Sequence, residues 1–229
     1  MHDKIELLDH GFVRLVDFQG SDLSIVRNAR VSYDAAWRAG KDGHGDAKLI
    51  NYLYNHGHNT PFEAVTATFE VKAPIFVFRQ WHRHRTQSYN ELSARYRELP
   101  EEFYVPEIPK INKQSDDNKQ MRTDDVHPRA NSIQRQLESA QLIAHGLYKT
   151  LLAEGCPREL ARTVLPLGTY SHMFATANLH SWFNFCRERM HEHAQYEIRV
   201  YAEAILGQLR KIAPVATQAF LNKLNDTNV

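Results

Sequence analysis

The longest regular pattern of apolar positions lies past the midpoint of the chain. Apolar residues recur there at alternating spacings of four and three, at Ile133, Leu137, Ala140, Ala144, Leu147 and Leu151. This spacing places one apolar stripe along a helix, so it predicts an amphipathic helix from about Ala130 to Ala153. Gly155 and Pro157 are suited to end it. We expect strands from earlier in the chain to cover the stripe.

Capping residues and shorter apolar patterns predict the other helices. Ser21 can cap a helix that runs to about Tyr33, and Pro74 suits the first turn of a helix from Ile75 to about His84. After a loop from Gly40 to Gly45, a further helix is predicted from Asp46 to about His56, with Leu49, Ile50 and Leu53 facing inward. The remaining predicted helices cover Arg158 to Leu165, a segment that begins at Asn178, and a last major helix marked by Tyr201, Ile205, Leu209 and Ile212 that ends before Pro214.

Three stretches rich in β-branched and aromatic residues predict strands. They are residues 12–18, residues 64–72 after an opening at Pro61, and residues 168–176. Strands and long helices do not alternate regularly, and no Gly-x-Gly-x-x-Gly follows a strand, so a doubly wound dinucleotide fold is not supported. Residues 106–128 are polar without an apolar period and predict a mobile surface excursion. We expect one domain spanning residues 1–229, with that polar loop at about 107–128.

Composition narrows the classes of function. The 229 residues are 42% hydrophobic and 24% charged, with a formal net charge of +1, which is too balanced for a protein whose main task is to neutralise a nucleic-acid backbone. The start lacks a basic segment followed by an apolar run, and no stretch approaches a membrane span, so we expect a cytoplasmic protein with no membrane partner. Cys156 and Cys186 are the only cysteines, and we expect them to be thiols that act as buried small hydrophobes rather than as catalysts.

The densest candidate chemistry lies between Arg79 and Tyr96. Four arginines, Arg79, Arg83, Arg85 and Arg95, stand there beside histidines, serines and aromatic residues. Because guanidinium groups are planar and permanently charged, the cluster predicts a site for phosphate or carboxylate. His82 and His84 invite a metal interpretation, but two residues apart on a helix they point to different sides, so we predict no metal site.

Arg83-His84-Arg85, separated by seven residues from Ser93, resembles the signature of the flavin-dependent thymidylate synthases. Asn90 to Tyr96 extends the similarity. Further similar segments are Ala29 to Tyr33, Gly57 to Glu63, Pro157 to Arg162, Asn184 to Arg189 and His193 to Gln195. Together they cover roughly residues 10 to 215 in the family's order. The resemblance implies an α+β fold in which a small antiparallel sheet is flanked by long helices, assembled as a homotetramer whose active sites are shared between subunits.

The resemblance also implies which residues form the site. For dUMP these are Gln80, Arg83, Glu91, Ser93, Ala94, Arg95, Arg162 and Arg189; for FAD they are His58, Thr60, Glu63, Arg83, His84, Arg85, Thr86, Asn178, His180, Asn184 and Arg189. Arg95 and Ser93 would grip phosphate, Arg189 would polarise the pyrimidine, and His58 would lie against the flavin ring, which makes Arg189 and His58 the catalytic candidates. Glu91 could equally contact the nucleotide or act as a counter-ion to an arginine. His180 departs from the arginine common in the family at this position.

The implied reaction is the methylation of dUMP to dTMP, with methylenetetrahydrofolate as carbon donor and NADPH as reductant, and without a covalent enzyme nucleophile. FAD would supply the hydride chemistry that no side chain can perform. Two other classes remain open. One is a nucleotide- or RNA-binding module that uses the arginines with Trp81, Tyr89 and Tyr96; the other is a metal-dependent hydrolase built on the histidines.

Overall fold

A computed structural model describes residues 4–227. Its centre is a five-stranded, wholly antiparallel sheet in the order β1-β2-β3-β7-β4. The strands are β1 (Ile5–Leu7), β2 (Gly11–Gln19), β3 (Thr66–Pro74), β7 (Tyr170–Asn178) and β4 (Ser88–Glu91). The antiparallel sheet confirms the expected fold class. No leader segment was expected at the start of the chain. Residues 1–3 of that start lie outside the described residues.

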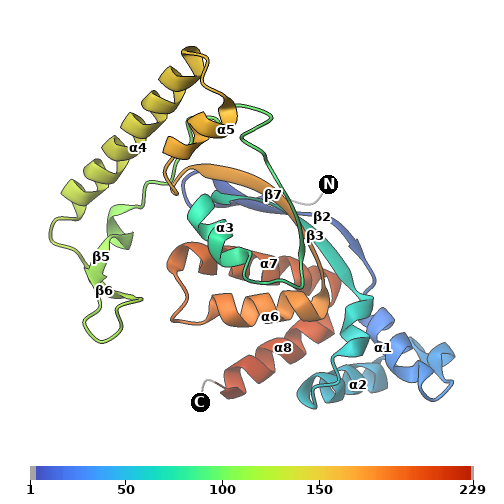
Figure 1. The fold of residues 1–229 in the computed structure, drawn as a ribbon. Coiled ribbons are helices and arrows are strands. Elements are labelled where there is room, and N and C mark those ends of the chain that lie inside the picture. Colours follow the sequence, from blue (N-terminus) through green and yellow to red (C-terminus); the bar gives the residue numbers. More distant parts are fainter. Residues whose placement is uncertain (1–3, 228–229) are drawn as a thin grey trace.

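Helices cover one face of this sheet and extend beyond its ends (Figure 1). The α-helices are α1 (Asp22–Val31), α2 (Gly43–Asn55), α3 (Ile75–Trp81), α4 (Ala130–Ala153), α5 (Arg158–Ala161), α6 (Leu179–Met190), α7 (Tyr196–Ile212) and α8 (Pro214–Thr227). Short 3₁₀ helices are η1 (Ala36–Arg38), η2 (Thr60–Ala64), η3 (Ile108–Lys110) and η4 (Arg162–Val164). Among the described residues, no helix is both long and apolar enough to cross a membrane.

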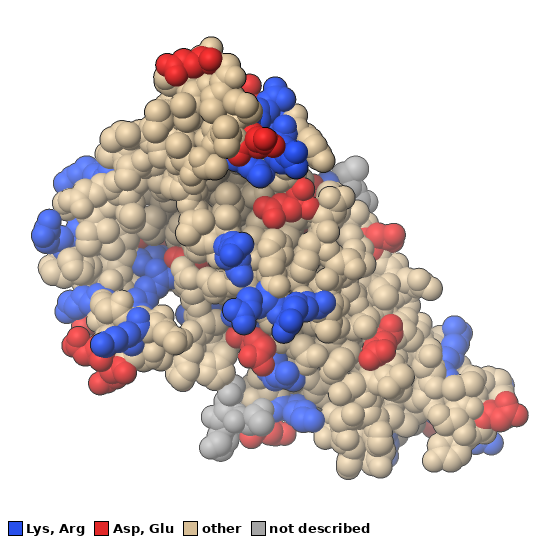
Figure 2. Space-filling model, in the orientation of Figure 1, with Lys and Arg blue, Asp and Glu red and all other residues tan. Residues whose placement is uncertain are grey.

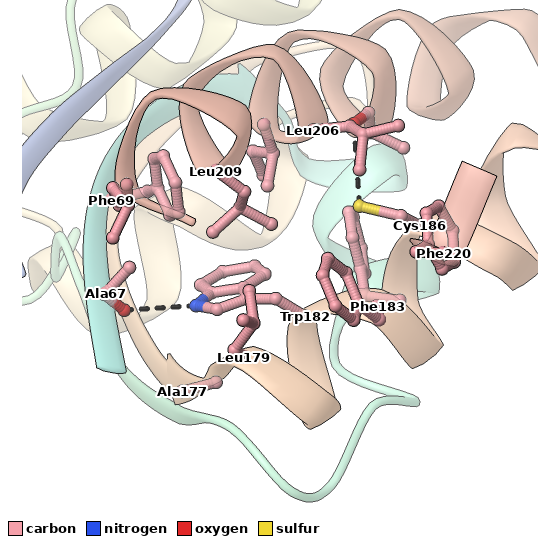
Figure 3. Close-up of a cluster of buried hydrophobic side chains, with 14 of the residues drawn as sticks. Ala67, Phe69, Ala177, Leu179, Trp182, Phe183, Cys186, Leu206, Leu209 and Phe220 are labelled. Atoms are coloured by element: carbon pink, nitrogen blue, oxygen red, sulfur yellow. Dashed lines mark hydrogen bonds between the residues drawn. The ribbon is translucent and has the colours of Figure 1, made fainter. Parts of the chain in front are cut away.

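The core lies between the sheet and the pair α6 and α7. Alternate residues of β3, such as Ala67, Phe69 and Val71, are buried against these helices. Trp182 of α6 packs edge-on against Phe69 with ring centroids 5.0 Å apart, and its indole Nε1 donates to the Ala67 carbonyl at 3.1 Å (Figure 3). This hydrogen bond satisfies the one polar atom of a fully buried tryptophan. It therefore fixes α6, which carries several predicted site residues, at a defined position on the sheet.

The predicted helix from Ala130 to Ala153 has these bounds in the structure, but its environment was predicted wrongly. The side of α4 that faces the body carries Gln141, His145 and Tyr148, and Gln141 Nε2 donates to the Tyr104 carbonyl at 2.8 Å. The apolar stripe is not covered by strands: Leu137 and Leu147 are 42% and 48% exposed. Figure 1 shows why, because α4 stands apart from the sheet and from α6 to α8.

Several other helix and strand boundaries in the structure differ from the predicted ones. Pro61 does not open a strand; it lies in the first turn of η2, and the strand begins at Thr66. The helix expected from Asp46 begins at Gly43, because the Asp42 side chain accepts a hydrogen bond from the Gly45 amide at 3.0 Å. The helix expected to reach His84 ends at Trp81.

Two segments contain regular structure that was not predicted. The polar stretch forms a hairpin of β5 (Asn112–Gln114) and β6 (Arg122–Val126) beside the start of α4. The last predicted helix, α7, ends at Ile212, before Pro214 as expected, but Pro214 then begins a further helix of fourteen residues, α8. Its first amides, those of Val215 and Ala216, donate to the carboxylate of Asp22 at 2.8 and 2.9 Å. A cap supplied from the other end of the chain leaves no local signal at the helix start.

Candidate active site

The arginine-rich segment turns sharply at the edge of the sheet. It leaves α3 after Trp81, passes through residues 82–87 and returns as β4. Tyr89 secures this turn, because its hydroxyl donates to the carbonyl oxygens of Trp81 at 3.2 Å and His84 at 2.7 Å. Inside the turn, Trp81 Nε1 donates to Gln87 Oε1 at 3.0 Å. These bonds fix the backbone that presents Arg83 to Thr86.

Arg189, near the end of α6, joins this turn to the helix. Its Nε donates to His84 Nε2 at 2.9 Å, and its Nη2 donates to the Gln80 carbonyl at 3.0 Å. The Gln80 side chain continues the network, with Nε2 donating to Gln195 Oε1 at 2.6 Å. The structure thus brings together three predicted site residues that are as much as 109 positions apart in the chain.

The charges in this cluster follow from burial. Burial and, to a lesser extent, the neighbouring Arg189 lower the pKa of His84 to about 4, although Glu188 opposes the change. Burial also lowers the pKa of Arg189 from its ordinary value, and Arg83 adds to this while Glu188 opposes it. His84 is therefore neutral at pH 7, with Nε2 as the unprotonated acceptor and Nδ1 carrying the hydrogen. A permanent cation beside a neutral imidazole can bind or polarise an electron-rich ligand.

A second group of predicted residues lies around α5. Arg95 Nη2 is 3.3 Å from Glu159 Oε2, and both side chains are more than half exposed. The Ser93 hydroxyl oxygen accepts from the Arg95 amide at 3.2 Å, and Arg162 is exposed at the start of η4, directly after α5. Ala94 is buried, so only its backbone is suited to contact a ligand. Within residues 4–227, no hydrogen bond or ion pair joins these residues to Gln80 or Arg189, so the predicted nucleotide site forms two separate groups in one chain.

Glu91 lies at the end of β4 and is held by β7. Ser171 Oγ donates to Glu91 Oε1 at 2.6 Å, and His82 Nε2 lies 4.0 Å from Glu91 Oε2. Within residues 4–227 its neighbours are thus a serine and a histidine rather than an arginine. This favours a carboxylate that accepts from a ligand over the counter-ion alternative.

The remaining predicted flavin residues gather at the other end of α6. Asn178 caps the helix, because its Oδ1 accepts from the Ser181 amide at 2.8 Å, and Asn184 Nδ2 lies 3.1 Å from His180 Nε2. Thr60 and Glu63 are exposed on η2, which packs against α6. His58 is exposed just after α2, with its ring parallel to that of Tyr52. At 1.5 Å per residue, Asn178 and Arg189 are separated by about 16 Å along the helix.

Among the described residues, the pair His82 and His84 belongs to no group that could hold a metal ion, and neither cysteine has the environment of a nucleophile. His82 packs against Tyr89, with ring centroids 4.8 Å apart, whereas His84 faces Phe185 and Arg189. Across the described residues, no group of three or more His, Cys, Asp or Glu side chains is arranged to hold a metal ion. Cys186 is fully buried and its thiol lies 3.7 Å from the Ala202 carbonyl; burial raises the pKa of this thiol. Cys156 is half-buried at the junction of α4 and α5.

Three residues that hold the site together were not among those that the resemblance assigned to dUMP or FAD. Tyr89 ties the turn, Gln195 holds the Gln80 side chain, and Ser171 holds Glu91. Tyr89 lies inside the arginine-rich segment, and Gln195 lies in one of the segments that resemble the family. Ser171 had no such signal, because its role depends on the pairing of β7 with β4.

Comparisons with known proteins agree with the fold. Residues 14–215 match the family described as Thymidylate synthase complementing protein, Thy1. A flavin-dependent thymidylate synthase of Treponema denticola is 45% identical over 96% of this chain and 82% of its own length, and that of Thermus thermophilus is 46% identical over 94% and 77%.

A solved structure extends the similarity to three dimensions. The UMP/dUMP methylase PolB from Streptomyces cacaoi, bound with 5-Br dUMP, superposes with a TM-score of 0.86 at 37% identity, covering 95% of this chain and 97% of that one. The family match and the extent of the alignments lead to one conclusion. The chain belongs to the family of flavin-dependent thymidylate synthases, which are methyltransferases.

Proposed function

We propose that this protein methylates dUMP to dTMP, with FAD bound as cofactor, methylenetetrahydrofolate as carbon donor and NADPH as reductant. The observation that supports this most directly is the cluster of Arg189, His84 and Gln80. It places a permanent cation, a neutral imidazole and an amide at one end of α6, next to an arginine-rich turn. Such a set can orient a uracil ring and stabilise charge that develops on its carbonyl oxygens.

The phosphate of dUMP is assigned to Arg95, Ser93 and Arg162. The exposed ion pair of Arg95 with Glu159 contributes little, typically about 0–1 kcal/mol, because water screens it. A dianionic phosphate can replace that carboxylate and form stronger, bidentate hydrogen bonds with the guanidinium. Glu159 thus keeps Arg95 at the surface without preventing binding. Gln80, Arg83, Glu91, Ala94 and Arg189 are assigned to the rest of the nucleotide.

The residues present fit a flavin. Arg83 and Arg85 are exposed, and within the described part of the chain neither forms an ion pair with a carboxylate, so their charges are available to anionic groups. Thr86, Asn178, Asn184 and His180 add hydrogen-bonding groups, and His58 adds an exposed ring. When bound, a flavin supplies the hydride chemistry that no amino-acid side chain can perform. The chain's own residues orient the nucleotide and polarise its ring.

We further propose that no side chain forms a covalent bond to the nucleotide. A thiol nucleophile needs access and a lowered pKa, whereas Cys186 is enclosed by the core and burial raises its pKa. The Ser93 hydroxyl oxygen accepts a hydrogen bond from the Arg95 amide. The Arg95 guanidinium is a cation and cannot act as the base that a serine nucleophile needs. Activation of the uracil is therefore assigned to polarisation by Arg189.

The active enzyme is proposed to be a homotetramer with shared sites. Two observations support assembly. The predicted nucleotide residues form two separate groups in one chain, and the apolar side of α4 is uncovered, with Ile143 as much as 74% exposed. Exposed apolar surface of this kind is typical of protein interfaces. A second copy of the chain that covers α4 would remove this apolar surface from water. The same assembly could bring the predicted nucleotide residues around α5 close to the Arg189 cluster of a neighbouring subunit.

The cofactor assignment has a simple experimental test. Protein purified after supplementation with FAD should show the visible absorbance of oxidised flavin and release FAD on denaturation. A colourless protein that fails to bind added FAD would contradict the proposal. The same measurement separates it from an RNA-binding module and from a metal-dependent hydrolase, neither of which requires a flavin.

A further inference from the structure

Gln195 reaches the candidate site from a different element than the residues already assigned to the nucleotide. It directly precedes α7, and its backbone carbonyl accepts from the amides of Ile198 at 3.2 Å and Arg199 at 3.1 Å. Its side-chain Oε1 accepts from Gln80 Nε2 at 2.6 Å. The resemblance assigned Gln80 to dUMP but gave Gln195 no role.

The start of α7 is firmly anchored, which fixes the position from which Gln195 acts. Glu197, two residues after Gln195, is buried, and its Oε1 accepts from Arg122 Nη2 at 2.9 Å and from the Tyr104 hydroxyl at 3.0 Å. The Arg122 bond ties α7 to the hairpin of β5 and β6. Gln195 itself is exposed. It is therefore not needed to fill the core, and its contact with Gln80 can serve the site.

Gln80 is held at both its backbone and its side chain. Its backbone carbonyl accepts from Arg189 Nη2 at 3.0 Å, and its side-chain nitrogen donates to Gln195. An amide nitrogen carries two hydrogens and an amide oxygen two lone pairs, so one N–H and the oxygen of Gln80 remain for a ligand. Turning this amide over would bring the Gln80 oxygen against the Gln195 oxygen, and two acceptors cannot share a hydrogen bond. The bond to Gln195 therefore determines the order in which Gln80 presents its donor and its acceptor.

The positive charge of the site does not distinguish one pyrimidine nucleotide from another. Figure 2 shows Lys and Arg side chains gathered over the region where Figure 1 places α6, and such cations suit the phosphate that dUMP and dCMP share. The two bases differ at positions 3 and 4. Uracil has an N–H donor beside the O4 acceptor, whereas cytosine has an unprotonated N3 acceptor beside an amino donor. A neutral amide whose donor and acceptor have a fixed order can read this difference.

We propose that Gln195 determines specificity for uracil over cytosine, as a positioning residue that acts through Gln80. Held by Gln195, the Gln80 amide donates to O4 of uracil and accepts from its N3–H. Cytosine would place its amino group against the Gln80 N–H and its N3 against the Gln80 oxygen, which leaves both pairs unmatched. It fits only if the amide turns over and the bond to Gln195 breaks. The inference rests on the proposed function and adds a residue that does not itself touch the nucleotide.

The test measures the affinities of FAD-loaded protein for dUMP and dCMP by isothermal titration calorimetry and compares their ratio between variants. Gln195→Met keeps the length of the side chain and removes its donor and acceptor, so the Gln80 amide becomes free to turn over. Because one net hydrogen bond is worth up to about tenfold in affinity, we expect the preference for dUMP to fall about tenfold, mainly through tighter binding of dCMP. Gln120→Met is the matched control, because Gln120 is also exposed and lines the same pocket as Gln195. It should leave the ratio unchanged.

Two charged variants test the direction of the bond between the glutamines. Gln195→Glu offers only acceptors, so it should hold the Gln80 amide as the wild type does and keep the preference within about threefold. Gln195→Lys offers only donors, so the Gln80 oxygen should turn towards it and dCMP should bind at least as tightly as dUMP. This pair of variants decides the question if Gln195→Met fails to fold. In a Gln80→Met background, Gln195→Met should change the ratio by less than about twofold.

The outcomes separate specificity from a merely structural role. Equal weakening of dUMP and dCMP binding in Gln195→Met, or a wild-type preference in Gln195→Lys, would overturn the proposal. A tenfold change in the ratio on adding Gln195→Met to Gln80→Met would show that Gln195 does not act through Gln80. Wild-type protein that binds neither nucleotide would instead contradict the proposed function itself.

Discussion

Arg189 donates from Nε to His84 Nε2 across 2.9 Å and thereby joins the end of α6 to the turn that follows α3. The geometry requires His84 to keep Nε2 unprotonated, because a guanidinium has no acceptor and two donors cannot share a hydrogen bond. Burial, together with the charge of Arg189, lowers the pKa of His84 to about 4, so the imidazole stays neutral in this contact at pH 7. Arg189 is therefore the cation of this pair, and His84 adds no second positive charge beside it at pH 7.

This contact predicts a pH dependence of stability. In the unfolded chain His84 takes up a proton near its ordinary pKa of 6.5, whereas in the folded protein it resists until about pH 4. The unfolded state therefore binds more protons between these values, and the contribution of His84 to stability, complete above pH 6.5, should be lost as the pH falls towards 4. Urea unfolding at pH 7 and pH 5 should show a larger loss in the wild type than in His84→Gln, whose amide oxygen can still accept from Arg189. Equal losses would show that His84 does not resist protonation.

Arg95 should act mainly in binding. Arg95→Ala removes a charged contact with the nucleotide phosphate, so we expect KM for dUMP to rise about 10- to 100-fold, with kcat changed less than about threefold. Arg97→Ala is the matched control, because Arg97 is also exposed and its Nε donates to the neighbouring Glu98 carbonyl at 3.4 Å. Steady-state kinetics with dUMP as the varied substrate measure both parameters. If Arg97→Ala had the larger effect, the phosphate would have to be reassigned.

Arg189 should act mainly on turnover. A donor that interacts more strongly with the transition state than with the bound substrate lowers kcat when removed, typically by about 10²- to 10³-fold. Arg189→Ala is expected to follow this pattern, and Arg189→Lys to recover part of the rate, since it restores charge without the planar fork. Single-turnover rates separate this effect from substrate affinity. A raised KM with unchanged kcat would assign Arg189 to uniform binding instead.

Neither cysteine should be needed for the reaction. Cys156→Ala combined with Cys186→Ala is expected to keep most of the activity, with a modest loss of stability, about 1 kcal/mol, from the change in the core at Cys186. Intact-protein mass spectrometry of the wild type during turnover with dUMP should show no nucleotide adduct. An adduct on either cysteine, or a folded, flavin-loaded double variant without activity, would overturn the proposal of a reaction without a covalent nucleophile.

The uncovered side of α4 should be an interface. Ile143→Asp with Leu147→Asp places two charges on this exposed apolar surface and should reduce both the size of the assembly and its activity. Arg135→Asp adds an acidic residue to the same helix outside the apolar stripe and should have little effect. Light scattering measures the mass of each variant. A wild-type protein that is fully active as a monomer would rule out shared sites.

The sequence predicted local structure best where the pattern was local. The bounds of α4 follow from its apolar spacing, and α6 begins directly after Asn178, whose side chain caps it. Prediction from the sequence failed where the start of a helix or its packing depends on residues far away in the chain. The start of α8 is capped by Asp22, and the covered side of α4 is set by contacts such as that between Gln141 and Tyr104 rather than by its own apolar stripe.

The same distinction holds for the site. The similarity to a known family predicted Arg189, His84 and Gln80 as site residues, but the hydrogen bonds that join them depend on how α6 packs beside α3. Gln195 and Ser171 take part only because folding brings them to Gln80 and Glu91.

The most direct test of the central claim is to follow the carbon atom into the nucleotide. Purified, FAD-loaded protein is incubated with dUMP, NADPH and methylenetetrahydrofolate whose methylene carbon is labelled with ¹³C, and the nucleotides are analysed by mass spectrometry. We predict dTMP that carries the label in its methyl group, and no dTMP when FAD is removed or when Arg189→Ala replaces the wild type under the same brief incubation. Recovery of unchanged dUMP from the complete mixture, with flavin bound and the protein folded, would contradict the account.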